Sequence, residues 1–284
     1  MSNALSYMAE EARRHDRDRF LCTLFAPEET REALFTLLAF NAEIAKSREM
    51  VREALLGEIR LQWWRDIIER LYNDPEGEIE DHAVVAALAK NIRQHNLSRH
   101  LFDELINARS RDMIDEPPKD QAELRNYAVG TSATLGALMM EASSASNEAE
   151  IRAVEHVGVA WSLTGILRAS FIFAKYKRVF IPQSVMQECG FDAYAFMEQK
   201  STPAIQQGVR QLVDLAEVEI NQARALTQGR ATKQVRAIFL QASLAEMYLK
   251  RIRRLDYNPF DRKIEGGRAM RQLRLGFKGV RGSF

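Results

Sequence analysis

Cysteine, proline and glycine are all scarce in this sequence. Its 284 residues include two cysteines, seven prolines and 14 glycines. Cys22 and Cys189 lie far apart in apolar surroundings, which argues against a disulfide framework or a cysteine metal site and fits a reducing compartment. Strand signals are also few, and little proline or glycine interrupts the helical periodicity. The sequence therefore predicts an all-α protein.

The sequence also lacks a long apolar run and a recognisable targeting segment. No stretch reaches the roughly 20 apolar residues that span a bilayer. The amino-terminal residues mix acidic and basic side chains, unlike a signal peptide or an acid-poor transit peptide. We expect a cytoplasmic protein whose contact with the inner face of the cytoplasmic membrane, or with the matrix side in a mitochondrion, is peripheral.

Lysine and arginine are concentrated near the carboxyl end. The whole chain carries 40 Lys and Arg against 39 Asp and Glu, a net charge of +1, so no nucleic-acid partner is expected. From Lys250 to Phe284, however, eleven basic residues face three acidic ones. This segment could hold the protein near anionic lipid, where each cation contributes about 1 kcal/mol, or it could be a solvated tail. We predict one domain over residues 1–260 and a basic, loosely ordered tail over residues 261–284.

Apolar residues recur every three or four positions along most of the chain, which is the pattern of amphipathic helices. No internal repeat or low-complexity linker divides the pattern, so a single-domain helical bundle is expected. The expected helices cover about 27–49, 56–73, 81–95, 97–113, 119–145, 148–176, 203–228 and 231–257, with two short helices between Pro182 and Pro203.

The common catalytic motifs are missing. The sequence has no glycine-rich phosphate loop, no G-x-S-x-G elbow, no H-E-x-x-H and no paired cysteine motif. The two closest histidines, His95 and His100, are five residues apart and so do not share a helical face. Residue types alone therefore indicate neither a metal site nor a catalytic group.

Four stretches resemble blocks of the squalene/phytoene synthase family, in the same order and spacing. They are ALFTLLAFNAE (33–43), GEIRLQWWRD (57–66), YAVGT (127–131) and LTGILR (163–168) with KRVFIP (177–182). The resemblance runs from about residue 15 to 258. It implies the isoprenoid synthase fold, an all-α bundle with two aspartate-rich motifs on facing helices. In that family the aspartates bind Mg²⁺, which neutralises an allylic diphosphate as its carbon–oxygen bond ionises.

Both aspartate motifs are degenerate here. The first should place acids at positions 45 and 49, where the chain has Ala45 and Glu49, the latter next to Arg48. The second should follow Arg168, where the chain has Ala169 to Phe173 and no acidic residue. No Asp or Glu occurs from residue 156 to 187, so no shift of register restores this motif. An apolar site disfavours a highly charged ligand, so we expect no bound metal and no cofactor.

Other residues of the resembling blocks are candidates for lining a cavity or binding an anion. They are Phe40, Glu43, Arg60, Trp64, Tyr127, Arg168 and Arg178. The alternative is that they are ordinary packing and rim residues of amphipathic helices. Glu43, Glu49 and Glu58 could also converge into a makeshift metal site, which is the one route by which catalysis could survive.

Within the family, the strings AFNAEIA (39–45), EIRLQWW (58–64) and LKRIRRLD (249–256) look more like the complex I assembly factor branch and its bacterial relatives than like true synthases. That branch also lacks the aspartate clusters. The resemblance implies a non-catalytic protein in the assembly of NADH:ubiquinone oxidoreductase, with a complex I subunit or assembly intermediate as partner, or one that binds an isoprenoid or other lipid. The alternatives are a lipid carrier and an active prenyltransferase that condenses isoprenyl diphosphates, for which alone Mg²⁺ would be needed.

Overall fold

The computed structural model describes residues 5–49, 53–77 and 81–284, apart from the side chain of Glu49. The described chain is helical. Its α-helices are α1 (Tyr7–His15), α2 (Arg17–Thr23), α3 (Glu28–Glu49), α4 (Ala54–Asn73), α5 (Ala83–His95), α6 (Arg99–Arg109), α7 (Gln121–Ala128), α8 (Thr134–Ala142), α9 (Glu148–Lys175), α10 (Gln183–Cys189), α11 (Ala193–Met197), α12 (Pro203–Thr227), α13 (Arg236–Arg254) and α14 (Arg268–Arg281). Short 3₁₀ turns cover Ser110–Met113 and Arg262–Glu265, and Val129–Ala133 forms a π-turn.

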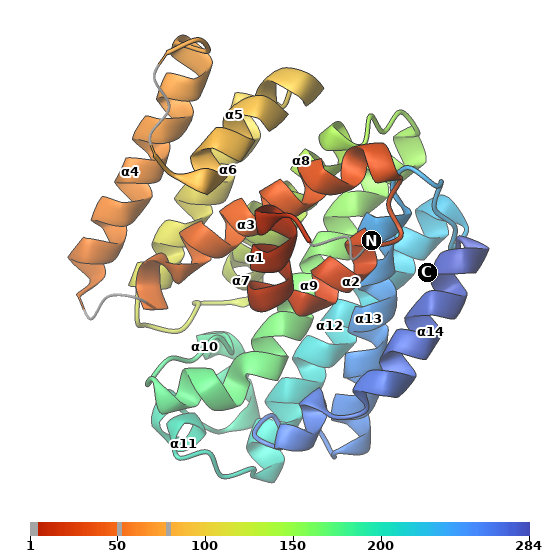
Figure 1. Cartoon of the computed structure of the whole chain (residues 1–284). Coiled ribbons are helices and arrows are strands. Elements are labelled where there is room, and N and C mark those ends of the chain that lie inside the picture. The colour runs from red at the N-terminus through yellow and green to blue at the C-terminus, as the bar shows by residue number, and fades with distance from the viewer. Residues whose placement is uncertain (1–4, 50–52, 78–80) are drawn as a thin grey trace.

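The helices form one bundle with α9 near its centre (Figure 1). Helix α9 packs against α12 and α13, and α3 packs against α1, α4, α5 and α8. Helices α4, α5 and α6 stand together on one side of the bundle, and α10 and α11 lie at one end. The all-α, single-bundle class expected from the sequence is confirmed.

Helix α9 has the composition of a membrane span but the surroundings of a core helix. Its length and apolar composition would allow it to cross a bilayer, yet 61% of its most apolar window is buried inside the protein. Among the described helices it alone meets those criteria. Gly158 allows α9 to pack closely against the π-turn, because a Cβ added at Gly158 would lie 2.3 Å from the Cα of Ala133.

Most of the expected helices are found with small changes of boundary. The expected helix 119–145 contains the π-turn at Val129–Ala133, and the helix expected from residue 231 begins at Arg236. The break between the last two long helices is at Gln228 and Gly229, which both adopt left-handed backbone angles (φ 56° and 67°). Helices α1 and α2 were not expected; both are short and rich in charged residues.

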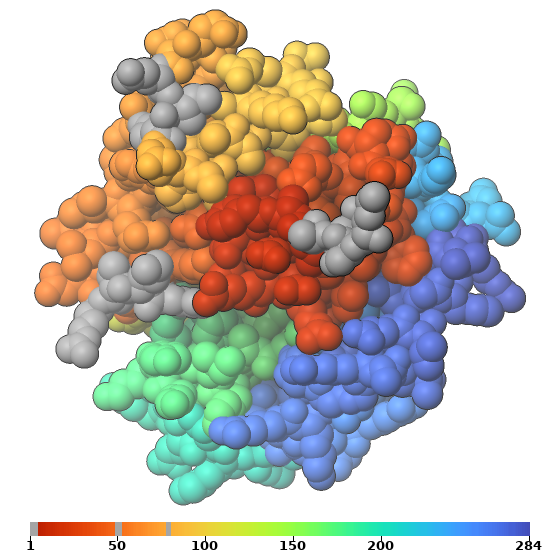
Figure 2. Space-filling view, in the orientation of Figure 1, coloured from red at the N-terminus to blue at the C-terminus, as the bar shows by residue number. Residues whose placement is uncertain are grey.

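The loosely ordered tail expected over residues 261–284 is wrong. Ile264, Leu275 and Phe284 belong to the hydrophobic core, and the Phe284 ring lies 4.9 Å from that of Phe239. Backbone bonds join the end of the chain to the loop before α13: Ala231 N donates to Gly282 O (3.0 Å) and Phe284 N to Gly229 O (3.2 Å). Four glycines after residue 266 suggested disorder, but Gly279 instead permits close packing, since a Cβ there would lie 2.5 Å from the Phe25 ring. Figure 2 shows the first described helices (red) beside α14 (dark blue) on one face of the molecule.

Candidate functional site

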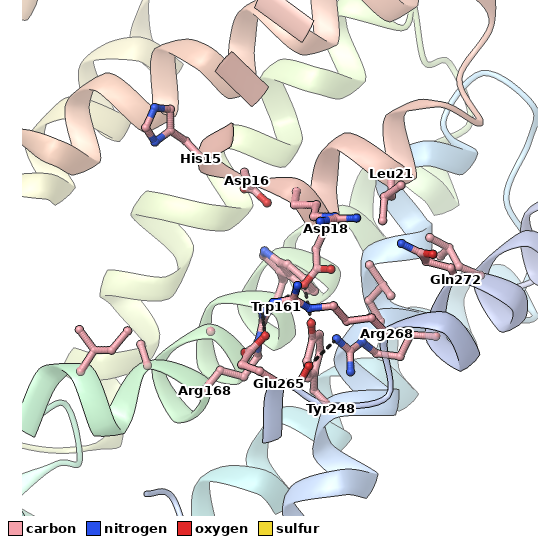
Figure 3. A pocket seen from close by; sticks show the side chains of 17 residues that line it. His15, Asp16, Asp18, Leu21, Trp161, Arg168, Tyr248, Glu265, Arg268 and Gln272 are labelled. Atoms are coloured by element: carbon pink, nitrogen blue, oxygen red, sulfur yellow. Dashed lines mark hydrogen bonds and ion pairs between the residues drawn. The ribbon is translucent and has the colours of Figure 1, made fainter. Parts of the chain in front are cut away.

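A cavity of about 450 Å³ lies between α2, α9, α13 and the carboxyl-terminal residues (Figure 3). Its walls carry four arginines, at positions 17, 168, 268 and 271, and three carboxylates, at positions 16, 18 and 265. Apolar and aromatic side chains, among them Trp161 and Ile172, line the rest. The volume falls in the range of about 300–1,000 Å³ typical of small-molecule pockets. The cavity therefore combines room for a ligand with a dense set of charges.

Arg168 links the charges of this cavity. Its guanidinium donates to both carboxylate oxygens of Glu265 (2.7 and 3.2 Å) and lies 3.0 Å from Asp18. It also stacks 3.7 Å from the ring centroid of Tyr248, whose hydroxyl donates to Asp18 (2.7 Å). Burial works to lower the pKa of Arg168, but the hydrogen bond to Glu265 and the neighbouring Tyr248 and Asp18 raise it overall. The guanidinium therefore stays charged and satisfies two of the cavity's three carboxylates.

The third carboxylate is held by a second buried arginine. Asp16 caps α2 by accepting from the backbone N–H of Arg19 (3.1 Å), and its other oxygen lies 3.4 Å from the Arg19 guanidinium. Arg19 also donates to Gln241 (3.0 Å) and to the hydroxyl of Ser132. Burial raises the pKa of Asp16, which the charge of Arg19 only partly offsets, and burial also lowers the pKa of Arg19. Each carboxylate on the cavity wall thus has an arginine partner.

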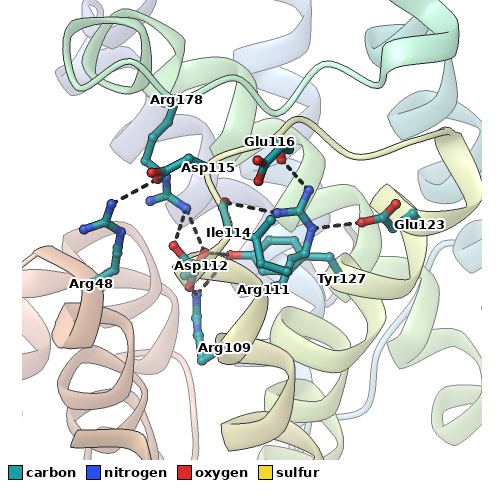
Figure 4. Close-up of polar contacts among 10 residues, drawn as sticks. All are labelled: Arg48, Arg109, Arg111, Asp112, Ile114, Asp115, Glu116, Glu123, Tyr127 and Arg178. Atoms are coloured by element: carbon teal, nitrogen blue, oxygen red, sulfur yellow. Dashed lines mark hydrogen bonds and ion pairs between the residues drawn. The ribbon is translucent and has the colours of Figure 1, made fainter. Parts of the chain in front are cut away.

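A second polar cluster is centred on Asp112, in the turn after α6 (Figure 4). Its carboxylate accepts from Tyr127 Oη (2.9 Å) and from the guanidinium groups of Arg109 (3.4 Å) and Arg178 (3.5 Å). Arg178 also donates to the backbone oxygen of Asp112 (3.0 Å), and Arg109 donates to Asn41 (3.0 Å). Burial and the Asp112 charge raise the pKa of Tyr127, so its hydroxyl remains a donor.

Aromatic rings close this second cluster. Phe180 packs against Tyr127 (5.7 Å between centroids) and against Phe173 (4.7 Å), and the Arg178 guanidinium lies 5.0 Å from the Phe180 ring. The side chain of Asp112 is only 9% exposed. The Asp112 cluster, defined as Arg109, Asp112, Tyr127 and Arg178, therefore ties α6, α7 and the segment after α9 together in a largely dry setting.

The candidate residues marked from the sequence do not form one site but lie in separate parts of the structure. Arg168 lines the cavity, and Ala169 lies beside it on the same wall. Tyr127 and Arg178 meet at Asp112, with Phe173 in the adjoining ring stack. Phe40 and Trp64 pack edge to face (5.2 Å) in the core and are at most 1% exposed.

Of the three carboxylates proposed for a makeshift metal site, Glu43 and Glu58 each have other partners in the described structure. Glu43 pairs with Lys46 (2.9 Å) and lies 3.9 Å from Arg60, whereas Glu58 accepts from Ser110 (3.2 Å). Ala45 is on the same helix as Glu43 and is partly exposed. The side chain of Glu49 lies outside the described residues. Over the described part of the chain, no group of three or more His, Cys, Asp or Glu is placed to hold a metal ion.

Sequence reasoning missed several of the residues that build these sites: Asp16, Asp18, Arg19, Arg109, Asp112, Tyr248 and Glu265. Asp16, Asp18 and Arg19 lie in the alternating stretch Asp-Arg-Asp-Arg, an unusual density of charge directly before the buried Phe20. This density of charge is the sequence signal by which Asp16, Asp18 and Arg19 could have been found. Asp112 and Glu265 gave no such signal, because Arg178 and Arg168, the arginines that bring them into these sites, come from distant parts of the chain.

Comparison with known proteins agrees with this architecture. The family model for squalene/phytoene synthase matches residues 12–274, so the chain belongs to the squalene/phytoene synthase family. It is similar to NADH dehydrogenase (ubiquinone) complex I, assembly factor 6, of Bos taurus, with 28% identity over 269 residues, 95% of this chain and 80% of the bovine protein.

Relatives that are named as synthases match a smaller share of this chain in sequence, but solved synthase structures match most of it in fold. The presqualene diphosphate synthase of Rhodopseudomonas palustris is 28% identical over 172 residues, which cover 59% of this chain and 58% of that protein. A solved dehydrosqualene synthase in complex with a ligand superposes with a TM-score of 0.80 at 16% identity, over 97% of this chain and 94% of that one. At that identity the likeness concerns the fold.

Proposed function

We propose that this protein acts in the assembly of respiratory complex I and does not transfer prenyl groups. The similarity to assembly factor 6 supports the role, because it extends over 95% of the chain, whereas the similarity to presqualene diphosphate synthase extends over 59%. The partner in this role is a complex I subunit or an assembly intermediate.

The residues of the cavity wall support the proposal that the protein does not transfer prenyl groups. Ala169 and Ile172 lie in the stretch where the family's second aspartate motif is expected, and they line the cavity with apolar side chains. The carboxylates that remain at the cavity are paired with arginines: Asp18 and Glu265 with Arg168, and Asp16 with Arg19. Mg²⁺ requires several free oxygen ligands, and these carboxylates could bind it only by giving up their arginine partners. The residues present therefore do not fit the metal.

The cavity is proposed to hold an isoprenoid or another lipid in place of a reacting diphosphate. Trp161, Ile172 and Leu244 offer apolar contact, and Arg17 and Arg268 at the same cavity offer positive charge to a polar head. This use of the cavity is compatible with the assembly role and also with the alternative of a lipid carrier.

The proposed location is the inner face of the cytoplasmic membrane, or the matrix face in a mitochondrion, where complex I is assembled. Peripheral contact through the basic carboxyl end is consistent with the absence of a solvent-exposed spanning helix among the described residues.

Deletion of the gene in the organism of origin tests the assembly role. We expect less assembled complex I on native gels and a lower NADH:ubiquinone activity, both restored by the wild-type gene. A normal amount of assembled complex I in the deletion strain would refute the role.

Gly165 allows the cavity to be tested separately. It lines the cavity, and a Cβ added there meets no atom within 4 Å. Gly165→Phe would fill the cavity without disturbing the helix, and Gly165→Ala is the matched control. We expect isoprenoid or lipid to copurify with the Gly165→Ala protein and to be absent from Gly165→Phe in mass spectrometry. Equal amounts in both variants, or none in either, would contradict a lipid-binding cavity.

A further inference from the structure

Helix α14 presents a row of large apolar side chains to solvent. Met270, Leu273, Phe277 and Val280 are 56%, 70%, 56% and 78% exposed. Their spacing of three, four and three residues places them on one face of the helix. Gly276 lies next to this row and has open space around it. We call these four residues the α14 apolar stripe.

The opposite face of α14 is firmly attached to the bundle. Leu275 is 2% exposed, Gly279 meets the Phe25 ring, and the Arg271 guanidinium stacks 4.3 Å from the Tyr248 ring. The residues that follow α14 are anchored through Phe284, whose backbone oxygen accepts from Arg224 (3.0 Å). Because the opposite face of α14 is packed against the bundle, the stripe faces solvent in a fixed orientation.

Positive charge lies along one side of the stripe. Helix α14 contains no acidic residue and carries Arg274, Lys278 and Arg281 beside the stripe. A groove between α13 and α14 includes Met270 of the stripe together with Lys250, Arg251, Arg254, Arg271 and Arg274. Arg254 and Arg274 have no ion-pair partner within the described ranges of the chain. An apolar face bordered by cations is the arrangement of a helix that lies in the surface of an anionic membrane.

The charges decide between the possible occupants of this face. A second copy of the chain meeting stripe to stripe would bring two sets of these cations together, which is unfavourable. A bilayer with anionic headgroups covers the apolar row and also neutralises the cations at its rim. Long arginine side chains suit this position, because their stems lie along apolar surface while the guanidinium reaches the phosphates.

We propose that α14 lies along the surface of an anionic bilayer, with the apolar stripe at the acyl boundary and Arg254, Arg274 and Arg281 at the headgroup phosphates. This inference rests on the proposed peripheral location and gives it a specific surface. The cavity lies against the inner face of the same helix, since Arg268, Arg271 and Leu275 line it. A lipid-facing α14 therefore brings the cavity to the membrane.

Cosedimentation of the full-length protein with vesicles tests the proposal. Vesicles of phosphatidylcholine alone are compared with vesicles that also contain phosphatidylglycerol, at low and high salt. We expect binding to the anionic vesicles and much weaker binding to the neutral ones, with a loss at high salt. The double variant Leu273→Gln with Phe277→Gln should reduce binding on the order of tenfold, because two apolar anchors are removed from the bilayer.

Matched controls lie on other helices. Leu55 and Ile59 on α4 are 68% and 56% exposed, close to Leu273 and Phe277 at 70% and 56%. Leu55→Gln with Ile59→Gln therefore changes polarity by a similar amount but away from α14. Arg254→Gln with Arg274→Gln is compared with Arg13→Gln and Lys90→Gln, two exposed cations on α1 and α5. We expect only the α14 and α13 variants to lose binding.

Two results would overturn the proposal. One is equal binding of the wild-type protein and the Leu273→Gln, Phe277→Gln variant, and the other is equal binding to neutral and anionic vesicles. A dimer in light scattering that this variant converts to a monomer, without vesicle binding, would identify a second copy as the occupant and would also overturn it. Vesicle binding is measured without complex I, so its failure is distinguishable from a failure of the assembly role.

Discussion

The cavity around Arg168 and the Asp112 cluster are built from the same kinds of residues and differ in what surrounds them. Both join arginines, carboxylates and a tyrosine hydroxyl that donates to an aspartate: Tyr248 to Asp18 in one and Tyr127 to Asp112 in the other. The first borders a cavity of about 450 Å³, and the second is closed by the rings of Phe173 and Phe180.

The charges of the Asp112 cluster therefore hold the structure together, whereas those at the cavity around Arg168 can also face a ligand. In the Asp112 cluster the side chains of Arg109, Asp112 and Arg178 are only 14%, 9% and 12% exposed, so each charge depends mainly on its protein partner. At the cavity, solvent or a ligand can replace a lost partner. The same substitution should therefore have a larger effect on stability in the closed cluster than at the cavity.

The largest expected effect is that of Asp112→Ala. It leaves Arg109 and Arg178 buried without their carboxylate, which should lower the free energy of unfolding by about 3–5 kcal/mol. Urea denaturation followed by circular dichroism measures the loss. The control is Asp115→Ala, since Asp115 pairs with Arg48 (3.0 Å) but is 65% exposed, and its loss should cost no more than about 1 kcal/mol. Equal costs for the two variants would mean that the Asp112 cluster is not effectively buried.

The two tyrosines provide a matched comparison of intermediate size. Tyr127→Phe and Tyr248→Phe each remove one hydroxyl that donates to an aspartate and keep the ring. The Asp112 side chain is 9% exposed and the Asp18 side chain 18% exposed, so water replaces a lost donor less readily at Asp112. We therefore expect Tyr127→Phe to cost about 1–3 kcal/mol and Tyr248→Phe to cost about 1 kcal/mol or less. Denaturation curves of both variants under one set of conditions decide the order. A larger cost for Tyr248→Phe than for Tyr127→Phe would mean that the site at the cavity is the less accessible to water.

The smallest expected effect concerns the pH dependence of Asp16. Burial raises its pKa above the ordinary value of 3.8, so the folded state binds this proton more tightly than the unfolded state does. Stability should therefore fall as pH rises from about 3.8 to the raised pKa of the folded protein, and the contribution is complete below that window. Asp16→Asn retains a side chain that caps helices well and should remove this component from a series of urea titrations over pH. An unchanged pH profile in the variant would show that Asp16 has no such shift.

Much of the fold could be predicted from the sequence, because it depends on local periodicity and on the family blocks. The helical class, most helix boundaries and the apolar stretch from Ala169 to Phe173 all follow from consecutive residues. Docking of α14 could not be predicted, because it depends on Phe25 and Phe239, which are remote in sequence from Gly279 and Phe284.

The sites were only partly predictable for a related reason. Tyr127, Arg168 and Arg178 stand in recognisable family blocks and were marked as candidates for lining a cavity or binding an anion. In the structure Arg168 lines the cavity, whereas Tyr127 and Arg178 meet at Asp112. Their carboxylate partners, Asp112, Asp18 and Glu265, were not marked, because an ion pair is a property of two distant segments. Phe40 and Trp64 were marked as cavity candidates, yet they pack in the core, where the same apolar pattern serves a different purpose.

Diphosphate release is the most direct test of the claim that the cavity no longer performs prenyl transfer. Purified protein is incubated with farnesyl or geranylgeranyl diphosphate and Mg²⁺ or Mn²⁺, and released diphosphate is measured against heat-denatured protein. We predict no release above that control, because Asp16, Asp18 and Glu265 are held by arginines and Ala169 and Ile172 offer no metal ligand. Metal-dependent release that the cavity-filling Gly165→Phe variant abolishes would contradict the claim and establish the protein as an active prenyltransferase.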